Sequence, residues 1–218
     1  MKKVIVVIVS LVAIIAVIML FLFAYDHKSK QEQLFSGYKL LPAEDSLIHD
    51  GDIILRYGYG IISDIIVEQL GETYSLSHCG IVCKNDSFIV IHSVSSSLYP
   101  IDGVQYQTMK DFVKDSKKNS IIVVRFKSPD KMKDASSISK RAYYYLNKKV
   151  PFDHKFDITD SSKIYCSELI YLVLKDEFGF DVFKDKIQSK LDHFRYAAFL
   201  DTNHFSVVLN HQLRNNPK

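Results

Sequence analysis

The sequence predicts an α+β domain, in which an antiparallel sheet packs against one main helix, preceded by a separate apolar N-terminal segment. Residues 166–178 repeat apolar side chains at the i, i+3, i+4 and i+7 spacing of one helix face. Residues 75–83 and 87–93 have the composition of β-strands, and the short turn between them is typical of an antiparallel hairpin. Residues 4–24 are apolar almost throughout.

The composition is that of a globular protein with nearly balanced charge. The 218 residues include 28 Lys and Arg against 25 Asp and Glu, and no basic cluster indicates a nucleic-acid partner. The length beyond the apolar segment is enough for one domain with a substantial core. The chain contains three cysteines, which are Cys79, Cys83 and Cys166. This low, odd number argues against a disulfide framework.

The apolar segment 4–24 is long enough to cross a membrane, because about 20 apolar residues span a bilayer as a helix. Ser10 is its one polar residue, and residues 20–25 offer no good cleavage site. We therefore expect an uncleaved anchor after a short tail at 1–3. No cysteine lies near the end of the segment, which excludes a bacterial lipoprotein anchor.

The orientation of this anchor depends on the charges at its two ends. Lys2 and Lys3 precede it, and Lys28 and Lys30 follow it, with Asp26 nearby. The free amino terminus adds positive charge to the first group, which favours a cytoplasmic N-terminus. We therefore expect a single-pass protein of the cytoplasmic membrane with its domain on the extracytoplasmic side.

The rest of the chain divides into a juxtamembrane linker at 25–50, a folded domain at 51–210 and a C-terminal tail at 211–218. Within the domain, short apolar runs between turn residues predict strands, and apolar residues at helical spacing predict helices. Outside the hairpin, strands are expected at 53–55, 121–126 and 205–209, and helices at 61–70, 108–113, 130–148 and 192–200.

The hairpin carries one histidine on each strand, and its register decides whether they meet. With a three-residue loop at 84–86, the numbers of paired residues sum to 170, so His78 lies directly across from His92 on the same face. A two-residue loop would place them on opposite faces. We expect the first arrangement. In the alternative, the two histidines are unrelated and each is satisfied locally.

Cys166 lies in the first turn of the predicted helix, on its inward face. Residues 160–162 supply N-cap side chains, and Gly179 is suited to the helix end. The helix dipole and free backbone N–H groups at such a position favour a thiolate. The alternative is that Cys166 is a small buried hydrophobe. A thiol with histidines on a neighbouring sheet, however, is the arrangement that nucleophilic catalysis requires.

Four short motifs, in order along the chain, resemble those of a known family. They are Gly-Asp-Ile-Ile at 51–54, Ser-His-Cys-Gly-Ile-Val at 77–82, Pro-Phe-Asp at 151–153 and Tyr-Cys-Ser-Glu-Leu at 165–169. Together they look like the motifs of the circularly permuted papain-like amidases, the YiiX-like branch of the NlpC-type cysteine peptidases. That branch also contains relatives of lecithin:retinol acyltransferase. The resemblance covers about residues 51–180 and implies a circularly permuted papain-like fold.

The resemblance implies Cys166 as the nucleophile, His78 as the general base and His92 as the third residue, which orients the base. Many members of the family have a carboxylate at this third position. We also expect substrate contacts from Tyr165 and Ser77, and we expect neither a metal nor another cofactor.

Three further motif positions are interpreted as structural or as lacking a family feature. Phe152 stands where the family often has tyrosine, so a hydroxyl role is lost there. Asp52 is expected to cap a turn. Glu168 is expected to form a surface or scaffold pair.

In the implied reaction, the Cys166 thiolate attacks a carbonyl carbon and His78 returns a proton to the leaving amine or alcohol. The backbone N–H of Cys166 is the expected oxyanion donor. We therefore expect a membrane-anchored cysteine hydrolase that cleaves a peptide or amino-acid amide, with cell-wall fragments as one source of substrate. A lipid-directed thiol acyltransferase or esterase, and a non-catalytic binding module on the same fold, are the alternatives.

A metal site at His78, Cys79 and Cys83 is disfavoured by strand geometry. Cys79 and Cys83 lie four residues apart, roughly 13 Å in an extended strand, whereas a zinc–sulfur bond is about 2.3 Å long. The same separation forbids a disulfide between them.

Overall fold

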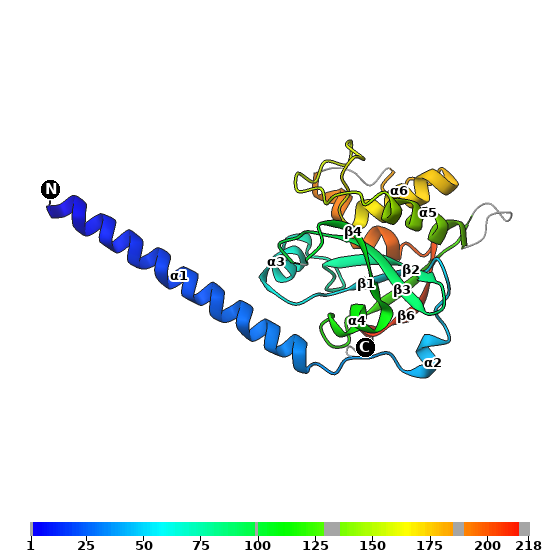
Figure 1. Ribbon diagram of the computed structural model, residues 1–218, viewed down its shortest axis with the longest axis horizontal. Helices are drawn as coiled ribbons and strands as arrows, with labels where there is room; N and C mark the ends of the chain where they lie inside the picture. Colours follow the sequence, from blue (N-terminus) through cyan, green and yellow to red (C-terminus); the bar gives the residue numbers. More distant parts are fainter. Residues whose placement is uncertain (1, 99, 129–135, 185–189, 214–218) are drawn as a thin grey trace.

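The computed structural model of this protein describes residues 2–98, 100–128, 136–184 and 190–213. Its centre is a six-stranded sheet in the order β4-β3-β2-β1-β5-β6, in which every neighbouring pair is antiparallel (Figure 1). The strands are β1 (Ile53–Arg56), β2 (His78–Lys84), β3 (Phe88–Val94), β4 (Gly103–Thr108), β5 (Ile122–Phe126) and β6 (Phe205–Asn210). The predicted α+β class with an antiparallel sheet is confirmed.

The helices lie on both sides of this sheet. They are α1 (Lys2–Phe35), α2 (Pro42–Asp45), α3 (Ile61–Leu70), α4 (Met109–Lys114), α5 (Ser136–Asn147) and α6 (Cys166–Phe178), with the 3-10 helices η1 (Lys190–Phe194) and η2 (Tyr196–Leu200). Figure 1 shows α5 and α6 above the sheet and α2 and α4 below it.

Alternation along the strands separates two apolar layers. Cys79, Ile81 and Cys83 of β2 face the first layer, which contains the buried side chains of α5 and α6. Val82 of β2 faces the second layer, which contains Phe112 of α4 and the apolar residues of the segment between α1 and β1. The helix that begins at the predicted nucleophile therefore packs on the first face of the sheet.

The β2–β3 hairpin holds both histidines on one face, as predicted, but its register differs from the predicted one. Lys84 pairs with Phe88, so the paired numbers sum to 172 rather than 170. The three-residue turn occupies 85–87, because Lys84 still belongs to the strand. His78 and His92 are therefore diagonal neighbours rather than direct partners.

Gly80 makes room for this diagonal contact. The hairpin register, continued by one pair, places Gly80 across from His92. A Cβ atom on Gly80 would lie 3.1 Å from His92 Cβ and 2.5 Å from Val90 Cγ1. Because no side chain occupies this place, the imidazole of His78 can reach that of His92 along the face of the sheet.

Residues 103–107 of the strand β4 lie outside every predicted element, and Thr108 belongs to the helix predicted at 108–113. In this strand, Gln105 and Gln107 are buried, whereas Tyr106 between them is 59% exposed. The burial pattern is thus the reverse of what polarity would indicate, since a half-buried strand normally turns its apolar side chains inward. This is why the alternation in the sequence gave no indication of the strand.

The other predicted elements are confirmed, with one exception and changes at their ends. The helix predicted at 130–148 is α5. Residues 130–135 of that prediction, and 214–218 of the predicted tail, lie outside the described residues. The helix predicted at 192–200 is instead two 3-10 helices, separated at Arg195.

The helix α1 begins as an exposed apolar helix and ends as a polar helix that contacts the domain. By length and composition, it is the one helix in the described part of the chain that could cross a membrane. It continues through residues 25–35 of the predicted linker. Ser29 Oγ accepts a hydrogen bond from Gly60 N at 2.7 Å, and Gln33 Nε2 donates to Asp115 Oδ1 at 2.7 Å. This stretch is therefore helical and attached to the domain.

Candidate active site

Cys166 is the first residue of α6, where backbone N–H groups are not used within the helix. Tyr165 is the N-cap residue. The backbone N of Tyr165 donates a hydrogen bond to the Glu168 carboxylate at 3.3 Å. The predicted N-cap at 160–162 is wrong, because these residues form a separate turn before the helix. Gly179 ends the helix with a φ of 63°, as predicted.

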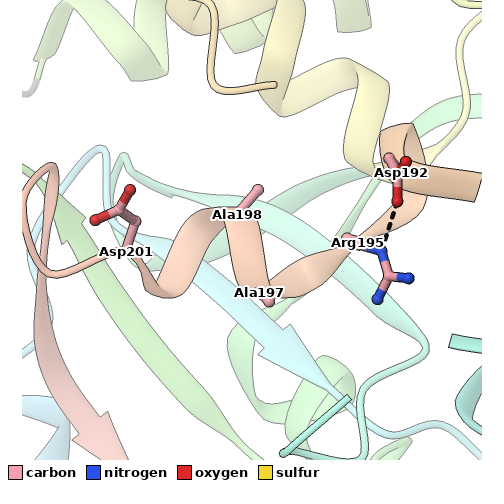
Figure 2. A pocket seen from close by; sticks show the side chains of 5 residues that line it. All are labelled: Asp192, Arg195, Ala197, Ala198 and Asp201. Carbon is pink, nitrogen blue, oxygen red and sulfur yellow. Dashed lines mark hydrogen bonds and ion pairs between the residues drawn. The ribbon is translucent and has the colours of Figure 1, made fainter. Parts of the chain in front are cut away.

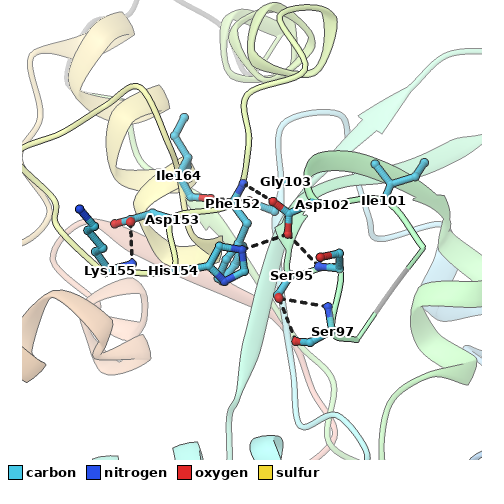
Figure 3. Close-up of polar contacts among 12 residues, drawn as sticks. Ser95, Ser97, Ile101, Asp102, Gly103, Phe152, Asp153, His154, Lys155 and Ile164 are labelled. Carbon is cyan, nitrogen blue, oxygen red and sulfur yellow. Dashed lines mark hydrogen bonds and ion pairs between the residues drawn. The ribbon is translucent and has the colours of Figure 1, made fainter.

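The loop before α6 is held against the end of β3, which sets the position of the helix start. Ser93 Oγ of β3 donates to Ile164 O at 2.5 Å, and Ile164 N donates to Pro151 O at 2.9 Å. Figure 3 shows the adjoining network, in which Asp102 Oδ2 accepts a hydrogen bond from Phe152 N at 3.4 Å. These contacts join the β3–β4 connection to the chain just before α6.

His78 and His92 form a hydrogen-bonded pair. His78 Nε2 lies 2.8 Å from His92 Nδ1, and the two rings meet edge-on. His92 is fully buried, whereas His78, the first residue of β2, is half-buried. Burial, together with the neighbouring histidine, holds the pKa of His92 well below its usual range. His92 is therefore neutral at neutral pH.

One arrangement of the ring hydrogens in this pair leaves His78 able to act as a base. If His78 Nε2–H donates to the neutral His92 Nδ1, then His78 Nδ1 is free to take a proton from a thiol. His78 and Cys166 also lie close enough to act on each other, since the thiol raises the pKa of the imidazole and the imidazole lowers the pKa of the thiol. The three residues thus form a continuous chain from thiol to imidazole to imidazole.

Cys166 is half-buried, and the hydroxyl oxygen of Tyr196 lies 3.5 Å from its Sγ. The neighbouring Cys79, His78 and Tyr196 hold the pKa of Cys166 well below its usual range. The positive end of α6 acts in the same direction. Burial raises the pKa of Cys79, so Cys79 keeps its proton. The surroundings therefore favour Cys166 as the thiolate.

A buried arginine and a phenylalanine form the wall behind the two histidines. Arg56 is the β1 partner of His78, and its guanidinium lies 4.1 Å from the Phe112 ring centroid. The Phe112 ring packs against both imidazoles, with centroid distances of 5.8 Å to His78 and 5.6 Å to His92. Burial, and to a smaller extent the charge of Arg56, lowers the pKa of both histidines, while the Cys166 thiolate opposes this at His78.

The structure brings together the three residues predicted to be catalytic and buries the two predicted to bind substrate. Ser77 is 4% exposed, and its Oγ accepts a hydrogen bond from Gly58 N at 2.9 Å. Tyr165 is 1% exposed and packs against Phe194. Both side chains are thus buried. Their contact with substrate is untested and stays a prediction.

The structural roles predicted for two acidic residues are confirmed in part. Asp52 accepts a hydrogen bond from His49 N at 2.8 Å in the turn before β1, as predicted, and it also pairs with Arg125. Glu168 is fully buried, which excludes the surface alternative and leaves the scaffold one. Burial raises the pKa of Glu168 to about 8.

Sequence reasoning missed Tyr196, Cys79 and Arg56 as neighbours of these residues. Tyr196 follows Cys166 by 30 residues, and no motif marks it. Cys79 is next to His78 in a strand, where adjacent side chains point to opposite faces, so its approach to the sulfur of Cys166 was not indicated. Arg56 did offer a signal, because it is a charged residue at the end of an otherwise apolar strand.

A cavity of about 310 Å³ lies at the two 3-10 helices. Figure 2 shows the residues that line it, which are Asp192, Arg195, Ala197, Ala198 and Asp201. None of these is a predicted catalytic residue, although Tyr196 lies between two of them in the chain. Asp192 and Arg195 form an ion pair of 2.7 Å in its wall.

The chain matches one protein family over most of its length. Residues 47–218 match a family described as permuted papain-like amidase enzyme, YaeF/YiiX, C92 family. The protein therefore belongs to the permuted papain-like amidases, an enzyme family, and the predicted family is confirmed.

A solved structure shows the same fold. The chain is similar to the metalloprotein YiiX from Escherichia coli O157:H7, with 20% sequence identity and a TM-score of 0.57. The alignment covers 74% of this chain and 97% of YiiX. The predicted permuted papain-like fold is thereby confirmed. No curated protein matches the sequence.

Proposed function

We propose that this protein is a membrane-anchored cysteine amidase in which Cys166 is the nucleophile, His78 the general base and His92 the residue that orients the base. The chain of contacts from sulfur to imidazole to imidazole is the observation that carries the proposal. Its inner link, from His78 Nε2 to His92 Nδ1, is 2.8 Å long. Cys166 and His78 are both half-buried, so this site is not closed off from solvent.

In the proposed reaction, the thiol proton rests on His78 Nδ1 and the Cys166 thiolate attacks the amide carbon, whose C=O electron pair moves to oxygen. Collapse of this intermediate breaks the carbon–nitrogen bond, and His78 Nδ1–H gives its proton to the leaving amine. His78 then takes a proton from a water molecule, which attacks the thioester and releases the acid and the thiolate. His92 accepts the hydrogen bond from His78 Nε2–H and keeps the ring in place.

Two donors are available to the oxyanion that forms in this attack. The first is the backbone N–H of Cys166 at the start of α6. The second is the hydroxyl of Tyr196, 3.5 Å from Sγ. Burial raises the pKa of Tyr196 well above its usual range, so the hydroxyl keeps its proton and donates. Tyr196 thus stabilises the thiolate before the attack and the oxyanion after it.

The substrate proposed here is a peptide or amino-acid amide, with cell-wall fragments as one source. The family supports an amide bond as the target. α1 supports a membrane location, because its apolar window has a mean hydropathy of 3.5 and its apolar side chains are exposed. The same helix would hold the domain beside lipids. That observation favours the second candidate, a lipid-directed thiol acyltransferase or esterase.

A metal ion does not fit the donor set of this site, although the similar YiiX is a metalloprotein. His78 Nε2 and His92 Nδ1 share a hydrogen bond at 2.8 Å, whereas two nitrogen ligands of one tetrahedral zinc ion would stand about 3.3 Å apart around it. Over the described ranges, no group of three His, Cys, Asp or Glu side chains could hold an ion. The proposed mechanism therefore has no metal step.

Turnover of matched substrates by the full chain in lipid nanodiscs tests the proposal. A fluorogenic aminoacyl amide, the corresponding ester and a fluorescent acyl lipid are compared for the native protein and for Cys166→Ala. We expect amide cleavage that Cys166→Ala abolishes and that Cys83→Ala, at a buried thiol of β2, retains. Amide cleavage that survives Cys166→Ala would refute the nucleophile. Turnover of the ester or the lipid alone would select the second candidate.

A further inference from the structure

The first two turns of α3 present an apolar surface that the domain leaves uncovered. Ile62 is 47% exposed and Ile65 is 48% exposed, although both are large aliphatic side chains. Glu68 and Gln69, the exposed residues of the last turn, are polar. The apolar surface formed by Ile62 and Ile65, the α3 patch, is therefore confined to the N-terminal half of the helix.

α3 contacts α1, and its first turn takes part in this contact. Gly60, the residue before α3, donates its backbone N–H to Ser29 Oγ at 2.7 Å, and the hydroxyl of Tyr25 donates to Asp64 of α3. Tyr25 directly follows the apolar stretch of α1. The domain therefore contacts α1 just beyond the stretch that is suited to hydrocarbon.

Asp64 is the acidic residue in these two turns of α3, and neighbouring groups balance its charge. Asp64 accepts hydrogen bonds from the hydroxyls of Tyr25 and Tyr57, and it pairs with Lys117 Nζ at 2.5 Å. Tyrosine is enriched at membrane–water interfaces, where its ring and its hydroxyl meet apolar and polar surroundings. The neighbours of the α3 patch therefore suit the boundary of a bilayer.

We propose that the α3 patch lies in the interfacial layer of the bilayer that α1 crosses and forms a second membrane contact of this protein. This inference rests on the proposed anchoring by α1. The hydrogen bonds of α1 to Asp64 and Gly60 come from Tyr25 and Ser29, just beyond the end of the apolar stretch, so the bilayer surface lies beside the patch. Ile62 and Ile65 then exchange water for acyl chains, which is a favourable transfer.

This contact holds one end of the sheet at the membrane surface. Arg56, the last residue of β1, pairs with His78, and Gly58 N donates to Ser77 Oγ. α3 begins at Ile61, so the bilayer contact lies a few residues from the strand end that carries the proposed base. A domain attached by α1 and α3 keeps this end oriented toward substrates that arrive along the membrane.

Tryptophan fluorescence tests this contact, because the chain contains no tryptophan. Ile65→Trp places one indole in the α3 patch. Val207→Trp is the matched control, because Val207 is 47% exposed and lies on β6, on the side of the domain away from the N-terminal part of α1 (Figure 1). Both full-length variants are placed in nanodiscs of phosphatidylcholine with brominated acyl chains. We expect at least about threefold stronger quenching for Ile65→Trp, with a blue-shifted emission maximum.

A second substitution and a binding assay separate the possible failures. Adding Ile62→Glu to Ile65→Trp should weaken the quenching, because a carboxylate resists the interface. Flotation with liposomes reports on the anchor itself. If the chain floats but both tryptophan variants are quenched equally, the α3 contact is refuted and the anchor stands. If the chain does not float, the proposed anchor fails, and the α3 contact fails with it.

Discussion

The protein contains a buried Tyr–His–Glu chain of side chains besides the Cys–His–His chain of the candidate site. Only the second of these two chains reaches solvent. In the first, the hydroxyl of Tyr38 contacts His211 Nδ1, and His211 Nε2 lies 3.1 Å from Glu44 Oε1. Their exposed fractions are 8%, 4% and 4% respectively. In the second, the thiol and the first imidazole are half-buried.

The difference separates a structural network from one suited to catalysis. The first chain contains a hydroxyl, an imidazole and a carboxylate in contact, which is the composition of a catalytic triad. It is closed to substrate, and it ties Tyr38 and Glu44, which precede β1, to His211, which follows β6. Hydrogen-bond connectivity therefore does not identify an active site by itself. Access and an activated nucleophile are also required.

The largest contrast is expected between His78 and an exposed histidine. His78→Ala should lower kcat/KM for the amide by about 10²–10⁴-fold, because the proposed base and proton donor is lost. His204→Ala, at an exposed histidine before β6, is the matched control and should stay within about twofold of the native protein. Comparable losses in the two variants would place the base elsewhere.

A smaller loss is expected at His92, which acts through His78. His92→Asn keeps an acceptor for His78 Nε2–H and should lower kcat by about 10-fold, whereas His92→Leu removes the acceptor and should cost about 100-fold. KM should change little, and His92→Leu should also shift the pH profile of kcat. Equal losses, with unaltered pH profiles, would show that His92 does not work by accepting this hydrogen bond.

In the buried Tyr–His–Glu chain, the expected effect is on stability alone. His211→Phe removes hydrogen bonds to Tyr38 and Glu44 and should lower the free energy of unfolding by about 1–3 kcal/mol. Thermal unfolding by circular dichroism measures this. Activity per folded molecule, counted by titrating the reactive thiol, should be unchanged. Lost activity at an unchanged melting temperature would contradict a purely structural role.

A pH-dependent effect on stability is expected at Glu168. Burial raises the pKa of Glu168 to about 8 from a usual value of 4.5. The unfolded chain loses this proton as the pH rises through 4.5, while the folded chain keeps it up to about pH 8, so stability falls across this window. Glu168→Gln keeps an acceptor for Tyr165 N and does not ionise.

Melting temperatures between about pH 5 and pH 8.5 would show the effect. We expect the native protein to lose more stability over this range than Glu168→Gln does. Parallel curves for the two proteins would mean that Glu168 ionises in the folded protein as it does in the unfolded chain.

Sequence patterns predict well which residues of the site share a face, because alternation along a strand is local. A three-residue turn at 84–86 or at 85–87 leaves His78 and His92 on the same face. The choice between these turns is not local. Lys84 N donates to Asp50 Oδ1, a residue 34 positions away, and the strand therefore includes Lys84. The alternation of apolar and polar residues in the hairpin does not reveal that contact.

The surroundings of the thiol depend on packing and were not predictable in the same way. Cys79 comes near Cys166 because α6 packs on β2, and Tyr196 comes near it because the preceding 3-10 helix, η1, packs against α6. Likewise, the polar residues of 25–35 indicate a linker by composition. Their hydrogen bonds to the domain, such as that of Ser29, make them part of a helix instead.

Selective alkylation tests the central claim, which is that His78 activates the thiol of Cys166. The full chain in nanodiscs is treated at about pH 7 with one equivalent of iodoacetamide, and the labelled cysteine is mapped by mass spectrometry. We expect Cys166 to be labelled ahead of Cys79 and Cys83 in the native protein, and this preference to be lost in His78→Ala. Labelling spread over all three thiols, or labelling of Cys166 that His78→Ala leaves unchanged, would contradict the claim.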